Sequence, residues 1–323
     1  MSLASSAVIL VAGPTASGKS ALAAMLAAQL NGTVINADAM QVYRDLPILT
    51  AQPDDAQSAA APHRLYAEVP PSQAFSAGQW LTAARQALTE ALTAGRTPIL
   101  CGGTGMYFQS LINGLAEIPP IPLELRARLR ADYERVGERS IRAQLAQHDP
   151  SAAEHITVGD RLRLLRALEI VLATGKTQRA WQASTTGGIG TTNIIPILLL
   201  PERTALYAAC DQRFTNMVER GAIAEVKALQ EQALDPTLPA MKTIGVPEIT
   251  DFLAGKCDWA TALSQAQQAT RNYAKRQLTW FRNQWQSNKI GFATPPILLH
   301  DFYNADMLHG LIRNMHTQPV MKL

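Results

Sequence analysis

The stretch VILVAGPTASGKS, residues 8–20, decides how the rest of the chain is interpreted. Residues 8–11 form a short apolar run of the kind found in buried strands. They lead into a complete match to the pattern G-x-x-x-x-G-K-[ST] at residues 13–20. Residues 20–30 are rich in alanine and leucine, which favour a helix. The motif therefore lies between a strand and a helix, which is the position of a phosphate-binding loop.

The residue types in this loop suit a phosphate group. Glycines let backbone amides turn towards phosphate oxygens, and the following helix adds the partial positive charge of its N-terminus. Lys19 supplies a point charge, and the Ser20 hydroxyl is the expected ligand of Mg²⁺, the cofactor that we predict. The residues expected to bind the diphosphate are Gly13, Thr15, Ala16, Ser17, Gly18, Lys19 and Ser20. The motif itself does not distinguish ATP from another diphosphate, and the alternative is a tight turn that needs glycine for its geometry alone.

Strands and helices alternate through the first 110 residues. Further buried strands are predicted at 33–36 and 98–101, and an amphipathic helix at 79–94. Such alternation predicts an α/β fold in which a parallel sheet carries helices on both faces, as in P-loop NTPases.

The pattern changes after the proline-rich segment 118–122. Residues 123–182 predict helices only, and 184–192 is a glycine- and threonine-rich turn segment. Strand-like runs at 194–200 and 297–299 would then return the chain to the sheet. We predict a discontinuous catalytic core, 1–120 and 190–323, interrupted by an all-helical insertion, 121–189.

The composition is that of a globular protein, with 47% hydrophobic and 17% charged residues. No apolar run approaches the length of a membrane span, and residues 1–6 lack the basic residues of a secretory leader. The three cysteines are far apart in the sequence, which fits a reducing compartment. We expect a cytoplasmic monomer without membrane contact.

Two polar residues follow predicted strands. Asp38 comes after the strand 33–36, and Thr104 follows the strand 98–101, where many NTPases carry an acid. Because parallel strands deliver their carboxyl ends to one crevice, both residues should approach the phosphate loop. A carboxylate there suits a general base. The alternatives are a turn or capping role for Asp38 and a turn hydroxyl for Thr104.

The charge distribution is more informative than the net charge of +3. Residues 259–300 contain no acid, and 270–282 predicts a helix in which basic and aromatic residues alternate. Such a helix can contact phosphates and stack bases, although an amphipathic core helix is an equal alternative. Arg163 and Arg166 share a helix face in the insertion. Two separated basic clusters fit a folded polyanion better than a small molecule.

Seven segments, taken in order, resemble the bacterial tRNA dimethylallyltransferases. They are 13–20, 36–43, 61–65, 102–107, 160–169, 244–245 and 270–282. That family transfers a dimethylallyl group from dimethylallyl diphosphate to N6 of the adenosine immediately 3′ of the anticodon. The resemblance implies that the phosphate loop holds this diphosphate rather than ATP. It also implies that the insertion grips the tRNA anticodon stem-loop.

The resemblance further implies roles for single residues. Asp38 would act as the base at the adenine amine, and Thr104 would hydrogen-bond the oxygen at the breaking bond. The positions expected to meet the RNA are Asp38, Ala39, Met40, Gln41, Thr104, Arg126, Arg163, Arg166, Lys242 and Gly245. The chain departs from the family at Ala209, where an arginine near the diphosphate is usual; Arg203 and Arg213 are the candidates to replace it. A small-molecule kinase and a non-catalytic RNA-binding protein are the competing hypotheses.

Overall fold

The computed structural model describes residues 7–301 and 306–317 of the 323 residues. The described chain divides into two compact units, one within Met1–Ile112 and Gly190–Leu323 and the other within Asn113–Ile189. We call them the core unit and the insertion unit. The predicted core also included 1–6, 302–305 and 318–323, which lie outside the described residues. Among the described residues, no helix is long and apolar enough to cross a membrane.

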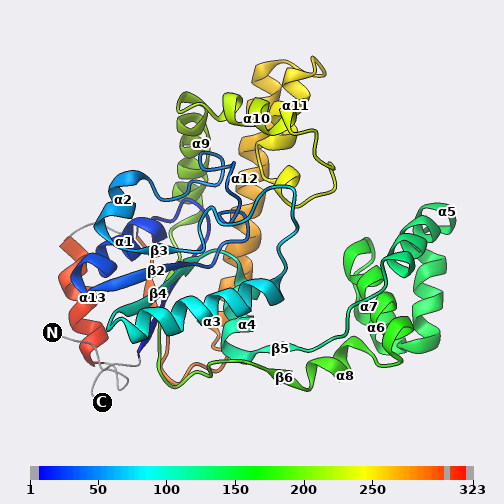
Figure 1. Cartoon of the computed structure of the whole chain (residues 1–323), viewed down its shortest axis with the longest axis horizontal. Coiled ribbons are helices and arrows are strands. Elements are labelled where there is room, and N and C mark those ends of the chain that lie inside the picture. Colours follow the sequence, from blue (N-terminus) through cyan, green and yellow to red (C-terminus); the bar gives the residue numbers. More distant parts are fainter. Residues whose placement is uncertain (1–6, 302–305, 318–323) are drawn as a thin grey trace. The chain divides into compact units, whose positions relative to one another are not determined.

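The core unit contains a six-stranded parallel sheet in the order β3-β2-β4-β1-β7-β8 (Figure 1). The strands are β1 Val8–Ala12, β2 Gly32–Asn36, β3 His63–Arg64, β4 Thr97–Gly102, β7 Ile194–Leu199 and β8 Ile297–Leu299. The sheet confirms the predicted α/β fold and all five predicted strands. The sequence did not predict β3, because two polar residues carry no apolar run.

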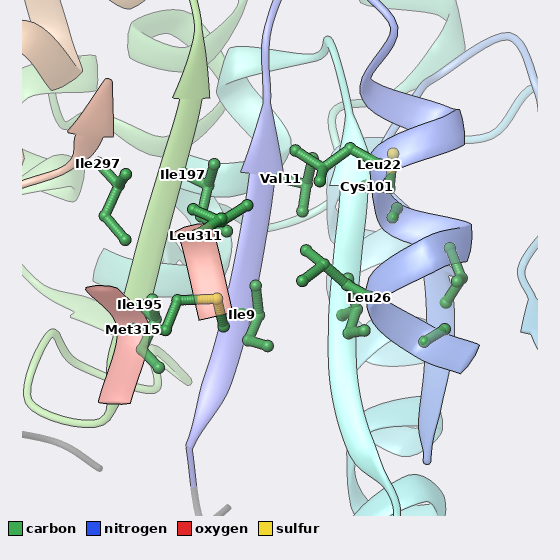
Figure 2. Packing of buried hydrophobic residues seen from close by; sticks show 14 of the residues in the cluster. Ile9, Val11, Leu22, Leu26, Cys101, Ile195, Ile197, Ile297, Leu311 and Met315 are labelled. Carbon is green, nitrogen blue, oxygen red and sulfur yellow. The ribbon is translucent and has the colours of Figure 1, made fainter. Parts of the chain in front are cut away.

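Helices cover both faces of this sheet. On one face, α1 (Lys19–Gln29) and α13 (Asp306–Thr317) pack against β1, β4 and β7 (Figure 2). This apolar cluster includes Ile9, Val11, Leu22, Leu26, Cys101, Ile195, Ile197, Leu311 and Met315. Strand side chains alternate between faces, so the fully buried Leu10 and Leu100, which are not in the cluster, point to the other face. Helix α3 (Ala77–Thr93) contacts β2 and β4 without joining the cluster and covers that second face.

The core unit contains further helices besides α1, α3 and α13. They are α2 Asp55–Ala60, α4 Gly105–Asn113, α9 Arg203–Glu219, α10 Ala222–Glu231, the 3-10 helix Ala240–Lys242, α11 Val246–Leu253, α12 Trp259–Phe281 and the π-helix Arg282–Gln286. A second apolar cluster joins the loop after β2 to α9, α10 and α11, through Val42, Leu49, Phe214 and Val246 among others. The helix predicted at 270–282 is the second half of α12, continued by a π-turn that the sequence did not predict.

The insertion unit has its own apolar core. Its helices are α5 Leu123–His148, α6 Pro150–His155, α7 Arg161–Thr174 and α8 Gln178–Gln182 (Figure 1). Leu129, Leu145, Leu164 and Leu168 are almost fully buried between them. The unit also contains a short antiparallel pair, β5 (Leu115–Ala116) with β6 (Thr185–Thr186), so it is not purely helical. Two-residue strands are too short to produce the alternating pattern that predicts a strand.

Candidate active site

Three adjacent strands bring the candidate catalytic residues to one edge of the sheet. β2, β4 and β1 are neighbours, and they are followed by Asp38, Thr104 and the phosphate loop. The Ala39 amide donates a hydrogen bond to Thr104 Oγ1 at 3.0 Å. The Thr104 amide in turn donates to the Ala37 carbonyl at 3.2 Å. The topology therefore joins the loops after β2 and β4, which are 65 residues apart in the sequence.

Two residues of the phosphate loop adopt left-handed backbone conformations. Ala16 and Gly18 have positive φ angles of 61° and 86°. Lys19 is the first residue of α1 and is almost fully buried, with Nζ donating to the Pro14 carbonyl at 3.2 Å. Burial lowers the pKa of Lys19, and the nearby charge of Asp38 acts in the opposite direction. The Ser17 hydroxyl is buried and has no hydrogen-bond partner among the described residues.

A turn formed by Asn36 fixes the position of Asp38. The Asp38 amide donates to Asn36 Oδ1 at 2.7 Å, and Asn36 Nδ2 donates to the Asp38 carbonyl at 3.0 Å. One carboxylate oxygen of Asp38 accepts a hydrogen bond from the Met40 amide at 3.0 Å. The carboxylate is close enough to raise the pKa of both Lys19 and Arg213, although burial lowers both. Asp38 is therefore a half-buried carboxylate beside the buried Lys19 and the half-buried Arg213.

Lys19, Asp38 and Arg213 line one cavity of about 260 Å³ in the core unit, whereas Thr104 is not among its lining residues. Its charged lining residues are Lys19, Asp38, Arg213, Lys242 and Arg276. Its apolar lining residues are Met40, Leu49, Cys210, Phe214, Met217 and Ile244. Four cations against one carboxylate favour an anion, and the apolar wall favours a hydrocarbon group. The cavity suits a small amphipathic anion.

The core-unit residues predicted to contact RNA have different environments. Asp38, Met40, Gln41 and Lys242 line the cavity, and Ala39 contacts Thr104 through its amide. Gln41 Nε2 already donates to the carbonyls of Thr50 and Ala51, at 3.0 and 2.8 Å. Gly245 begins α11 with a φ of 99°, and a Cβ there would lie 2.6 Å from Leu49. Both the positive φ and the close packing against Leu49 therefore favour glycine at this position.

In the insertion unit, the three predicted arginines surround acidic residues. Arg126 and Arg166 each lie 3.5 Å from the carboxylate of Glu169, which is 8% exposed. Arg163 lies 3.4 Å from Asp160, but its side chain is 80% exposed. Arg163 is therefore the most accessible of the three cations.

Of the two arginines proposed to replace the missing one at position 209, Arg213 lines the cavity and Arg203 does not. The sequence did not assign a site role to two residues that the structure places at this edge of the sheet. The Tyr273 hydroxyl hydrogen-bonds Thr104. Burial raises the pKa of Tyr273. Gln277 contacts both the phosphate loop and the loop after β4. Tyr273 and Gln277 stand out in the sequence only by their helical spacing, which a purely structural helix also shows.

The fold and the site define an α/β protein with a G-x-x-x-x-G-K-[ST] loop after β1 and a cavity that suits an amphipathic anion. Residues 41–284 match the family model described as IPP transferase. The chain belongs to this family.

Named relatives cover most of the chain. The chain is 50% identical over 277 residues to a tRNA dimethylallyltransferase of Rhodopseudomonas palustris strain TIE-1, covering 85% of this chain and 92% of the relative. It is 48% identical over 281 residues to the tRNA dimethylallyltransferase of Rhodospirillum centenum, covering 86% and 88%.

Two solved structures are similar over nearly the whole chain. The full-length tRNA isopentenylpyrophosphate transferase of Bacillus halodurans has a TM-score of 0.70 and 31% identity, covering 98% of this chain and 97% of that one. A eukaryotic dimethylallyltransferase acting on tRNA has a TM-score of 0.80 and 28% identity, covering 97% and 80%.

Proposed function

We propose that this chain transfers a dimethylallyl group from dimethylallyl diphosphate to N6 of the adenosine immediately 3′ of the anticodon in tRNAs, releasing diphosphate. The observation that carries the proposal is the cavity in which Lys19 faces Asp38 beside an apolar wall that includes Phe214. The diphosphate would lie against the cations, and the branched hydrocarbon against the apolar wall. The family membership and the names of the relatives support the same reaction.

The site residues fit the chemistry of this transfer. Adenine N6 is a poor nucleophile, because its lone pair is delocalised into the ring. In the reaction its bond to C1 of the dimethylallyl group forms while the bond from C1 to the diphosphate oxygen breaks. Asp38 would take the N6 proton, since its carboxylate is held by the Met40 amide at the cavity wall. Lys19 and the Thr104 hydroxyl would stabilise the charge that develops on the leaving diphosphate.

The residues present also fit a magnesium ion that is bound mainly by the substrate. Mg²⁺ commonly keeps several waters and takes one or two protein ligands together with substrate phosphates. Ser20 lies on the cavity wall at the start of α1 and would supply one hydroxyl. The described residues hold no group of three or more histidines, cysteines or acids that would form an all-protein metal site. When bound, Mg²⁺ would neutralise part of the charge on the leaving diphosphate.

The tRNA anticodon stem-loop is the proposed macromolecular partner. The reacting adenine must leave its stack to reach a cavity of this size. The insertion unit presents Arg163, and α12 presents Lys275 and Arg276 beside Trp280 along an open groove. Cations interleaved with an aromatic ring suit a ribose-phosphate backbone and unstacked bases. A cytoplasmic monomer accords with a tRNA substrate and with three free cysteines.

One experiment tests the reaction directly. The chain is incubated with dimethylallyl diphosphate, Mg²⁺ and an anticodon stem-loop, and the RNA mass is measured. An increase by one dimethylallyl group, minus one hydrogen, is expected. A parallel incubation with ATP in place of the prenyl donor tests the kinase alternative. Phosphate transfer from ATP, with no prenyl transfer, would overturn the proposal.

Arg163→Ala should weaken stem-loop binding by removing one exposed phosphate contact. The slope of log affinity against log salt should become shallower by about 0.7 to 0.9. Arg135→Ala is the matched control, because Arg135 is also exposed in the insertion unit and also pairs with an aspartate three residues away. Titrations at several salt concentrations measure both slopes. Equal changes in the two variants would mean that Arg163 is not a specific contact.

Ala209→Arg should lower KM for dimethylallyl diphosphate. Ala209 lies one turn before Arg213 on α9, so an arginine there can extend towards the same cavity. A charged hydrogen bond contributes about 1.5–3 kcal/mol, and solvent screening at this half-buried position reduces the expected gain to about tenfold in KM. Steady-state kinetics with varied prenyl donor measure it. An unchanged KM would indicate that Arg213 already supplies the missing charge.

A further inference from the structure

The side chain of Gln277 connects the phosphate loop to the loop after β4. It projects from α12 and is 5% exposed. The Thr15 amide donates a hydrogen bond to Gln277 Oε1 at 2.8 Å. Gln277 Nε2 donates to the Gly103 carbonyl at 2.9 Å. One side-chain amide thus satisfies a donor in the first loop and an acceptor in the second.

Two glycines allow α12 to approach the loop after β4 this closely. A Cβ on Gly103 would lie 2.1 Å from Gln277 Nε2, and a Cβ on Gly105 would lie 2.4 Å from the Trp280 ring. Tyr273, one turn before Gln277, hydrogen-bonds Thr104 between these glycines. The same face of α12 therefore contacts three consecutive residues of the loop, and only Gln277 continues to the phosphate loop.

The contact with Thr15 distinguishes this loop from one whose amides all face the phosphate. A loop of this kind binds anions because its backbone amides converge on the ligand. Here the amide hydrogen of Thr15 points to Gln277, so the start of the loop is fixed by α12 and not by the ligand. The positions of the later amides and of Lys19 depend on where this start is held.

We propose that Gln277 is a positioning residue, which holds the phosphate loop and the Thr104 loop in one arrangement around the departing diphosphate. This role rests on the proposed function, because it concerns the site of the prenyl diphosphate. Gln277 does not line the cavity, so it acts through the loops it holds. Misplacement of a reacting group by about 1 Å can cost about 10²-fold in rate.

The chemistry of the side chain makes the proposal testable. Gln277 must accept from Thr15 and donate to Gly103 at the same time. A methionine fills a similar volume but makes neither hydrogen bond. An ionised glutamate accepts but cannot donate, and it places a negative charge beside the diphosphate loop. A protonated glutamate has both capacities and reproduces the glutamine.

Gln277→Met should reduce kcat/KM for dimethylallyl diphosphate by about 10- to 100-fold, chiefly through KM. Stem-loop affinity should stay within about twofold of the unmodified chain, since the cationic surface of α12 is unchanged. Gln267→Met is the matched control. Gln267 also lies on α12 and also donates to a backbone carbonyl, that of Asp211, but it contacts neither loop. The control variant should retain the original kinetics.

The pH dependence of Gln277→Glu distinguishes a positioning role from a purely structural one. The ratio of its kcat/KM to that of the unmodified chain should rise at least about fivefold as the pH falls through the pKa of the new carboxyl. Burial and the facing Gly103 carbonyl should hold that pKa above the ordinary value of about 4.3. Taking the ratio removes the pH dependence that both proteins share through the charged and titratable groups around the site, which are Asp38, Lys19, Arg213 and the tyrosines around Thr104. A ratio that is flat with pH would overturn the positioning role.

Binding of inorganic diphosphate, measured by calorimetry, separates this proposal from the function on which it rests. A chain that transfers no prenyl group would contradict the proposed function, yet weaker diphosphate binding in Gln277→Met would still support the positioning role. Equal diphosphate binding in Gln277→Met and the unmodified chain would overturn it. A loss of stem-loop affinity in Gln277→Met as large as its loss of diphosphate affinity would also overturn the proposal, because it would indicate that α12 itself has lost its packing. If Gln277→Met does not fold, the positioning role is tested by the pH dependence of the kcat/KM ratio between Gln277→Glu and the unmodified chain.

Discussion

Asp38→Asn should leave stem-loop affinity unchanged and slow single-turnover prenyl transfer by about 10²–10⁴-fold, the usual contribution of a positioned general base. The substitution keeps the shape of the side chain and an oxygen that can accept from the Met40 amide. It removes the basicity that the transfer requires. Affinity is measured by titration with the stem-loop, and rate by quenched single-turnover reactions.

Affinity and rate are both measured, because their combination distinguishes a general base from a residue that recognises the RNA or supports the turn. If affinity falls together with rate, Asp38 recognises the RNA or supports the turn with Asn36. If both are unchanged, Asp38 is not the base, and the Thr104 hydroxyl or a water must take the proton. Asp45→Asn is the control, since Asp45 follows the same strand but is exposed and bonded to Gln232. It should be silent in both assays.

The central part of the fold was predictable because its signals are local. A buried parallel strand has a continuous apolar run, and a phosphate loop must lie between a strand and a helix. Once β1, β2 and β4 are adjacent, Asp38 and Thr104 follow as neighbours of the loop. The sheet order that makes these strands adjacent is set by crossovers, which no single segment of the sequence encodes.

The contributions of α9 and α12 were harder to predict, because they arise from packing between distant segments. Gln277 lies 262 residues after Thr15 of the phosphate loop, and nothing in its local pattern marks it. Arg213 was a candidate only through the family resemblance at the neighbouring position Ala209. The role of a basic residue is also difficult to predict from the sequence, because the same charge can contact RNA or pair with an acid in the fold. Arg271 belongs to the basic stretch that suggested RNA, yet it lies 2.5 Å from Asp211 in an ion pair between helices.

Lys19→Ala should lower kcat/KM for the prenyl donor by about 10²-fold or more, as for other lost electrostatic stabilisers of a leaving group. The reason is that Lys19 is the buried cation of the phosphate loop. Affinity for the stem-loop alone should change little. Lys256→Ala is the control, because Lys256 is exposed and paired with Asp251. Near-normal turnover in Lys19→Ala would contradict the role assigned to the loop.

The lowered pKa of Lys19 predicts how the reaction responds to alkaline pH. Burial lowers the pKa of Lys19 in the free protein, and Asp38 offsets this only in part. A lowered pKa means that the charge is present at low pH and is lost as the pH rises, earlier than for an ordinary lysine. kcat/KM for the prenyl donor reports the free protein, so its alkaline limb should fall below the usual lysine value of about 10.4. Lys19→Arg, which stays charged, should move that limb to higher pH even if its absolute rate is lower. An alkaline limb at the same pH in both proteins would assign the titration to another group and leave Lys19 without an electrostatic role in this range.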